Sequence, residues 1–234
     1  MKENKVLCAV ILALGIVIMG FALKQGIDNF TNKDRKVTVK GLAEREVDAD
    51  KVTWPIQTKE IGNDLGELYT RINSTNSAVK QFLLSNGIKA EEININAPTV
   101  IDMSAERYQS NPVTQRYNIT STITVTSNNV KQVRQIMAKQ GELLKQGIAI
   151  VDGGYENPIR YEFVAFQKMK PEMITEAIEN AEKTAQQFAE NSHSVLNKII
   201  SADQGQFSIE NRDENTPFIK KVRVVTTVTY SLKD

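Results

Sequence analysis

Cysteine, histidine and tryptophan each occur only once in this chain of 234 residues. The single cysteine, Cys8, lies in an apolar run near the N-terminus, so the rest of the chain can form no disulfide and must be stabilised by burial. A metal site needs several His, Cys or carboxylate ligands at suitable spacing, and the chain has neither a histidine pair nor a second cysteine. We therefore predict no metal ligand, and expect His193 to have a structural role at a helix C-terminus.

Catalytic and cofactor-binding motifs are also missing. The sequence contains no G-x-S-x-G, and no Ser-x-x-Lys with its supporting motifs. Asp152-Gly153-Gly154 leads into Tyr-Glu-Asn-Pro rather than into the Gly-Lys-Ser or Gly-Lys-Thr of a phosphate-binding loop, and predicts a turn. We therefore predict no catalytic residue, no cofactor and no enzyme activity. The enzymatic alternative would need a carboxylate-based site that no spacing reveals.

Charge of one sign is not in excess. The chain carries 29 Lys and Arg against 28 Asp and Glu, and no basic cluster stands out. Nucleic-acid binding depends on such a cluster, and so does binding to lipid headgroups through a polybasic patch. We therefore predict no nucleic-acid partner.

One long hydrophobic run is present, from residue 6 to residue 23, and it predicts a membrane partner. A helix of that length is about 27 Å long, close to the ~30 Å of a bilayer core. Lys2 and Lys5 before the run favour a cytoplasmic N-terminus. The apolar side chains of the segment are Val6, Leu7, Val10, Ile11, Leu12, Leu14, Ile16, Val17, Ile18, Phe21 and Leu23.

This run leaves two alternatives for localisation. Residues 1–23 form either an uncleaved anchor, with a single pass through the cytoplasmic membrane, or a cleaved signal segment ending near Gly20-Phe21-Ala22. Residues 24–35 are polar and are predicted as a linker. Residues 36–234 are then an exported domain, which stays bound to the membrane in the first case and is soluble outside it in the second.

Three segments of the exported part have helical periodicity. The first, residues 63–85, starts at the cap candidates Asn63 and Asp64, and the second covers residues 129–145. Gly87 and Gly147 follow these two helices as C-terminal glycines. The third is expected to begin at Pro171 in its first turn, and its alanines predict close packing against the element beneath it.

Strand-like runs lie between these helices, so that the order is a strand, three strand-helix-strand units and a closing strand. The helices would act as crossovers, and strands with one polar face favour helices on one side of the sheet only. We therefore predict an α+β fold with one or more mixed sheets, preceded by the membrane helix. Pro55 lacks a ladder donor and predicts an edge position or a bulge.

Residues 116–126 alternate strictly between apolar and polar side chains. The polar face includes Thr120, Thr122, Thr124 and Thr126, a row of β-branched hydroxyls. Such a face could dock another subunit or a polymer such as peptidoglycan, although exposure to solvent alone would also explain it. We name these four threonines as a candidate interaction face.

The stretch Val37-Thr38-Val39-Lys40-Gly41 and the run that ends in Ala49-Asp50 resemble the opening of the bacterial SIMPL-domain family. The helix with alanine at every fourth position from Ala177 to Ala189, followed by a strand, is also similar to that family. Ala43 and Ala49 stand where the family commonly has glycine and proline.

The resemblance implies export to the periplasm or the cell surface. Residues 1–23 would then be a single-pass anchor in the bacterial inner membrane with residues 36–234 in the periplasm, or, after cleavage, the domain would be soluble in the periplasm. The family includes a periplasmic immunogenic protein and a protein linked to defence against oxidative stress. It also has members that look like ring-forming homo-oligomers, and no established enzyme activity comes with it.

Taken together, these features predict a non-catalytic, envelope-anchored protein that self-associates and contributes to envelope integrity or oxidative-stress tolerance. The alternative is a periplasmic binding module for a small molecule or a cell-wall glycan. In either role, the protein could also bind another protein of the cell envelope.

Overall fold

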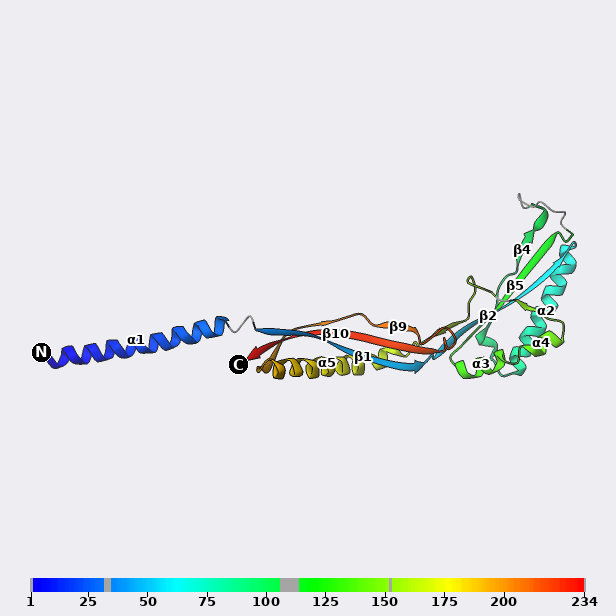
Figure 1. Cartoon of the computed structure of the whole chain (residues 1–234). Helices are drawn as coiled ribbons and strands as arrows, with labels where there is room; N and C mark the ends of the chain where they lie inside the picture. Colours follow the sequence, from blue (N-terminus) through cyan, green and yellow to red (C-terminus); the bar gives the residue numbers. More distant parts are fainter. Residues whose placement is uncertain (1, 32–34, 106–113, 152, 234) are drawn as a thin grey trace. The chain divides into compact units, whose positions relative to one another are not determined.

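The computed structural model describes residues 2–31, 35–105, 114–151 and 153–233, and in the first of these stretches it describes side chains only for residues 12–27. The chain divides into two compact units. Unit 1 contains Met1–Arg45, Lys168–Ser208 and Val222–Asp234, and unit 2 contains Glu46–Gln167 and Ile209–Lys221. Figure 1 shows the elements of each unit with their labels.

The first element is a helix, α1 (Lys2–Thr31), which includes the predicted apolar segment and residues 24–31 of the predicted linker. Leu12, Leu14, Ile16, Val17, Ile18, Phe21 and Leu23 are all exposed on it. The side chains of Val6, Leu7, Val10 and Ile11 lie outside the described residues. Within the described part of the chain, no helix combines the length and the apolar character needed to cross a membrane.

Unit 2 is built on a six-stranded sheet. Its strands are β2 (Lys51–Gly62), β3 (Ile93–Ile95), β4 (Thr99–Asp102), β5 (Tyr117–Ser127), β6 (Ile150–Val151) and β7 (Arg160–Glu162). The order is β3-β5-β2-β6, with β4 also beside β5 and β7 also beside β2. Neighbours are antiparallel, so β2 and β3, which both pair with β5, run in the same direction, as the predicted crossover requires.

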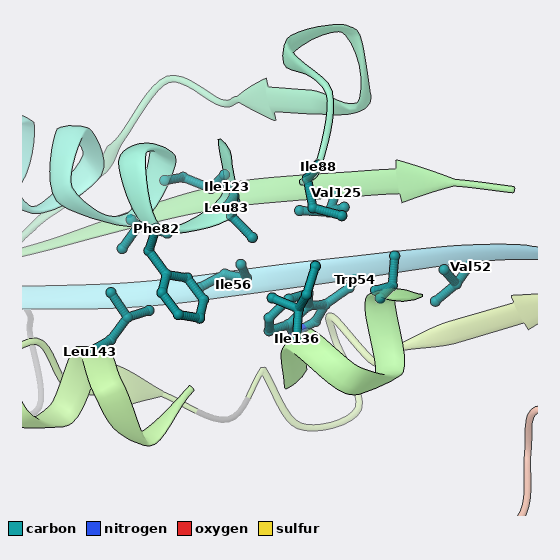
Figure 2. Packing of buried hydrophobic residues seen from close by; sticks show 12 residues of the cluster. Val52, Trp54, Ile56, Phe82, Leu83, Ile88, Ile123, Val125, Ile136 and Leu143 are labelled. Atoms are coloured by element: carbon teal, nitrogen blue, oxygen red, sulfur yellow. The ribbon is translucent and has the colours of Figure 1, made fainter. Parts of the chain in front are cut away.

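Three α-helices of unit 2 pack on one face of this sheet (Figure 1). They are α2 (Leu65–Ser85), α3 (Val130–Met137) and α4 (Gly141–Lys145); two short 3₁₀ helices, η2 (Ala90–Glu92) and η3 (Met103–Ala105), lie in the connections. Asp64 caps α2 by accepting a hydrogen bond from the Glu67 amide at 3.0 Å. Figure 2 shows Phe82 of α2, Ile136 of α3 and Leu143 of α4 packed with Trp54 and Ile56 of β2 in one hydrophobic cluster.

Pro55 interrupts one side of β2. On that side β7 pairs with residues 51–53 and β6 pairs with residues 57 and 58, so within the described residues no strand pairs with residues 54–56 between them. The interruption is expected because proline has no N–H to donate to a ladder. The prediction was an edge position or a bulge. Pro55 lies in a strand that has neighbours on both sides, but at a local break where only the β5 side is paired in the described structure.

Unit 1 contains most of a four-stranded sheet, in the order β1-β10-β8, with β9 beside β10. Its strands are β1 (Lys36–Asp48), β8 (Val195–Gln204), β9 (Ser208–Asn211) and β10 (Ile219–Lys233), and its helix is α5 (Phe166–Asn191). Ala177, Ala181, Ala185 and Ala189 on one face of α5 are fully buried, as the alanine spacing predicted. A Cβ built on Gly41 of β1 would lie only 1.8 Å from the Ala177 carbonyl oxygen, so strand and helix backbones are in direct contact.

Three sequence-based expectations need correction. The predicted second helix is two helices, because i→i−3 hydrogen bonds such as Lys139 N–H to Ile136 O tighten the chain between α3 and α4. Helix α5 starts at Phe166, and Pro171 lies inside it. The ring of a proline within a helix crowds the carbonyl group of the residue four positions earlier. Here that carbonyl is in the first turn of α5, so the helix can begin before Pro171.

The third correction concerns the predicted units. The strand before α5, β7, belongs to the six-stranded sheet, whereas the strand after it, β8, belongs to the four-stranded sheet. Helix α5 is therefore no crossover within one sheet. The α+β class is confirmed, and of the one or more sheets that the sequence allowed, the structure has two.

Candidate functional site

No group of three or more His, Cys, Asp and Glu side chains that could hold a metal ion occurs among the described residues. Met173, a residue of α5, is fully buried. Its role is core packing, which methionine commonly has. The predicted Asp152-Gly153-Gly154 turn is confirmed in its described part, since the Asn157 amide donates to the Gly153 carbonyl at 3.2 Å.

His193 lies at the C-terminus of α5, as predicted. The Ser194 amide donates to the Ala189 carbonyl at 2.9 Å, and the His193 amide donates to the Glu190 carbonyl at 3.1 Å. This pair of bonds is a Schellman motif, which needs a left-handed residue at the position of His193. Its φ is +54°, and Gly87 and Gly147 hold the equivalent positions after α2 and α4 with φ of +92° and +80°. The geometry gives His193 a structural role.

Glycine at position 193 should therefore stabilise the protein. A non-glycine residue in the left-handed region costs about 1 kcal/mol, so we expect His193→Gly to raise the free energy of unfolding by about that amount in urea titrations. Gly147→Ala is the matched control, because a Cβ there would meet nothing within 4 Å, so only the backbone conformation is disfavoured. It should lower stability by about 1 kcal/mol. A loss of stability in His193→Gly would contradict this assignment.

The predicted threonine face is on β5, on the side away from the helices. Thr120, Thr122 and Thr124 are half-buried and Thr126 is exposed. The intervening Ile119, Ser121, Ile123 and Val125 are buried on the opposite face. The four threonines thus share one face, and across β2 they are opposite Lys59, Gln57, Pro55 and Thr53. The structure brings these residues together as a polar surface, and its use for docking stays a prediction.

Arg116 precedes this face, and its charge is compensated. Its guanidinium donates to the Asp102 carboxylate at 2.8 Å and lies 4.9 Å from the Tyr117 ring centroid. The hydrogen bond from Arg116, followed by that from Ser104, lowers the pKa of Asp102 well below its usual range. The polar surface therefore has a paired ion at this end.

The second candidate surface is strand β8, at the edge of the four-stranded sheet. It pairs antiparallel with β10, from Val195 opposite Lys233 to Gln204 opposite Thr226. In the part of the chain that the structure describes, no strand pairs with its other edge. Val195, Ile199 and Ile200 are 61%, 51% and 54% exposed. Edge strands in soluble proteins are usually short, charged or interrupted by proline, whereas β8 has ten residues, no proline and one lysine.

The sequence predicted this strand but not its exposure. The signal was the pair Ile199-Ile200, because adjacent isoleucines cannot both face one core in a strand. The pair alone does not identify an exposed strand, because adjacent apolar residues are also typical of a strand that is buried on both faces.

The Ala49–Asp50 turn between β1 and β2 is a third feature that the sequence did not reveal. The Asp50 carboxylate accepts hydrogen bonds from the Val164 and Ala165 amides at 2.6 and 2.7 Å. The backbone amides of Ala49 and Asp50 donate to the Phe218 and Glu162 carbonyls. The turn thus fixes two distant segments of unit 2. The Asp50 side chain, part of the motif that resembles the SIMPL opening, has a structural role here.

A cleft of about 580 Å³ adjoins this turn and includes Asp48, Lys131, Arg134 and Phe218 among its lining residues. The Arg134 guanidinium stacks on the Phe218 ring, 3.3 Å from the centroid, and Tyr161 meets the same ring edge-on at 6.2 Å. Burial raises the pKa of the Tyr161 phenol, and the Arg134 charge opposes that rise. Charges of both signs line the cleft, and its aromatic wall is already occupied by Arg134.

The model of the SIMPL family, described as a protein of unknown function (DUF541), matches residues 37–230. A search of curated proteins gave no match. The family match covers both units of the structure, from β1 to β10, and most of the chain. The chain therefore belongs to the SIMPL family.

Proposed function

We propose that this protein is a non-catalytic, envelope-anchored protein that self-associates in the periplasm and contributes to envelope integrity or oxidative-stress tolerance. The apolar run of residues 6–23 supports attachment to the inner membrane, with residues 36–234 on the periplasmic side. Cleavage after this run would instead give a soluble periplasmic protein with the same domain.

The observation that carries the proposal is the unpaired edge of β8. Its outer edge presents backbone N–H and C=O groups to a partner strand, and its isoleucines are exposed beside them. A second copy of β8 would satisfy these groups through an antiparallel pair related by a two-fold axis, the symmetry of most homodimers. The interface would also cover Val195, Ile199 and Ile200 on both copies.

Charges placed on this edge should prevent association. We expect the fragment of residues 25–234 to be oligomeric at tens of micromolar, and the double variant Ile199→Lys with Ile200→Lys to be monomeric. Two lysines on each copy would be brought against each other, which should weaken association about 100-fold. Static light scattering measures the mass of each species.

Ile61→Lys is the control for this experiment. Ile61 is 56% exposed, like the two β8 isoleucines, but lies in β2 of the other sheet. Its variant should retain the wild-type mass. A strict wild-type monomer at these concentrations would refute self-association, and an oligomeric lysine double variant would refute the assignment to β8.

A second function, a binding module for a small molecule or a cell-wall glycan, is favoured by one separate observation. Unit 2 has a recess at the β2 interruption, and Trp54, Leu144 and Ile159 are among the described residues that line it. Recesses with apolar walls and few polar groups are typical small-molecule sites.

A further inference from the structure

The core of unit 2 contains a polar layer between α2 and the sheet. Thr58 of β2, Asn76 of α2 and Ser121 of β5 form it, and they are 3%, 6% and 0% exposed. Thr58 and Ser121 are opposite each other in the antiparallel pair of β2 and β5. Both are on the helix-covered face, since Ile56 and Ile119, two residues away along their strands, are buried there.

Asn76 lies over this pair of hydroxyl residues. In α2 it follows Ile72 by four residues and precedes Val79 by three, so all three share the buried face of the helix. Ile72 belongs to a hydrophobic cluster with Ile119, and Val79 belongs to another with Ile123. The serine of the layer is midway between these two isoleucines on β5, so the asparagine reaches the same level of the core, between the two clusters.

The buried oxygens of this layer have no hydrogen-bond partner within the part of the chain that the structure describes. They are Thr58 Oγ1, Asn76 Oδ1 and Ser121 Oγ. Buried polar atoms are almost always hydrogen-bonded in native proteins, because an unpaired one raises the free energy of the folded state. Three such atoms at one level of the core therefore indicate a shared polar partner.

Water is the partner that fits these three atoms. The Asn76 oxygen only accepts, whereas each hydroxyl can donate or accept, and a water molecule has two protons and two lone pairs. A water would donate to Asn76 Oδ1 and to one hydroxyl and accept from the other, which gives three hydrogen bonds, the usual number for a buried water. Ser121 also leaves room for it, because its side chain is much smaller than those of Ile119 and Ile123 on either side.

We propose that Thr58, Asn76 and Ser121 form a binding site for one structural water, which joins α2 to β2 and β5. The water separates the two hydrophobic clusters of the core, so α2 is held to the sheet by polar as well as apolar contacts. The site depends neither on association of β8 nor on ligand binding in the recess at Pro55. Its test therefore has no bearing on either of the functions proposed above.

A crystal structure of the full chain in detergent tests the proposal directly, at a resolution that shows ordered waters elsewhere in the protein. Electron density for one water is expected at about 2.8 Å from each of Thr58 Oγ1, Asn76 Oδ1 and Ser121 Oγ. Direct hydrogen bonds among the three side chains, with no water density between them, would overturn the proposal.

Asn76→Leu should destabilise the protein, because leucine cannot bind the water and leaves both hydroxyls without a partner. The equilibrium constant for unfolding should rise at least about 10-fold in urea titrations of the full chain. Asn73→Leu is the matched control, because Asn73 is exposed on the same helix. It should be as stable as the wild type, since leucine favours a helix over asparagine. Equal stability of the two variants would show that the layer needs no polar partner.

A triple variant, Thr58→Val with Asn76→Leu and Ser121→Val, separates a water site from a dry layer. The substitutions remove every unpaired oxygen of the layer, and the added carbon atoms at position 121 fill the space of the water. The triple variant should therefore be more stable than Asn76→Leu and close to the wild type. In a dry, fully packed layer the added atoms would have no room, and a triple variant no more stable than Asn76→Leu would overturn the water site.

Discussion

Gly41→Ala is expected to unfold unit 1 or to destabilise it by about 4 kcal/mol or more. A Cβ at this position would lie 1.8 Å from the Ala177 carbonyl oxygen, 2.6 Å from the Ala181 amide nitrogen and 2.8 Å from the Ala181 Cβ. Two of these atoms belong to the α5 backbone, so no side-chain rotation can relieve the clash. Urea unfolding followed by circular dichroism measures the loss.

Gly141→Ala provides the control for this substitution. Gly141 is the first residue of α4, and a Cβ there would meet nothing within 4 Å. Alanine favours a helix over glycine by up to about 1 kcal/mol, so this variant should be as stable as the wild type or slightly more stable. If Gly41→Ala lost less than 1 kcal/mol, strand β1 and helix α5 could not be packed as closely as described.

Asp50→Ala is expected to destabilise unit 2 by about 2 to 3 kcal/mol. The substitution removes a carboxylate that accepts two backbone amides at 2.6 and 2.7 Å, and it leaves both amides without this partner. Hydrogen bonds to a charged group contribute more than neutral ones, which gives the size of the effect. The same urea unfolding measures it, and Asp50→Asn should lie between the wild type and alanine because one acceptor oxygen remains.

Asp48→Ala serves as its control. Asp48 is an exposed carboxylate two residues earlier in the same turn region, so its loss should change the free energy of unfolding by no more than about 0.5 kcal/mol. Equal effects at positions 48 and 50 would show that net charge, rather than the two hydrogen bonds, determines stability here.

Local features of the fold were predictable because local rules govern them. Gly87 and Gly147 end their helices because the Schellman motif needs a left-handed residue. The alanines of α5 predicted a close approach, which Gly41 provides from the other side. The alternation of β5 predicted which of its faces is buried.

Strand partners and helix boundaries were less predictable, because they depend on contacts far apart in sequence. Nothing local shows that β7 pairs with β2 while β8 pairs with β10. Likewise, Pro171 is a good first-turn residue, and only the tertiary structure extends α5 back to Phe166.

The candidate surfaces were only partly predictable for the same reason. The threonine face follows from alternation alone, since all four residues have the same parity along β5. Exposure of β8 depends on the width of the sheet relative to the one helix that covers it. The recess depends on how β6 and β7 meet at Pro55. The resemblance to the SIMPL family predicted the family correctly. It pointed neither to the threonine face nor to the exposed edge of β8.

The most direct test of the central claim, that this protein acts through association of its β8 edges, is disulfide cross-linking of the full chain in cells. Cys8 is first replaced by serine, and single cysteines are then placed at positions 198–202. In an antiparallel pair related by a two-fold axis, directly opposed Cβ atoms are roughly 5 Å apart, close enough for a disulfide after small adjustments. We predict covalent dimers at positions near the axis, and none for Tyr155→Cys, an exposed residue of unit 2. Absence of dimers at all five β8 positions, in protein shown to be exported and folded, would contradict the claim.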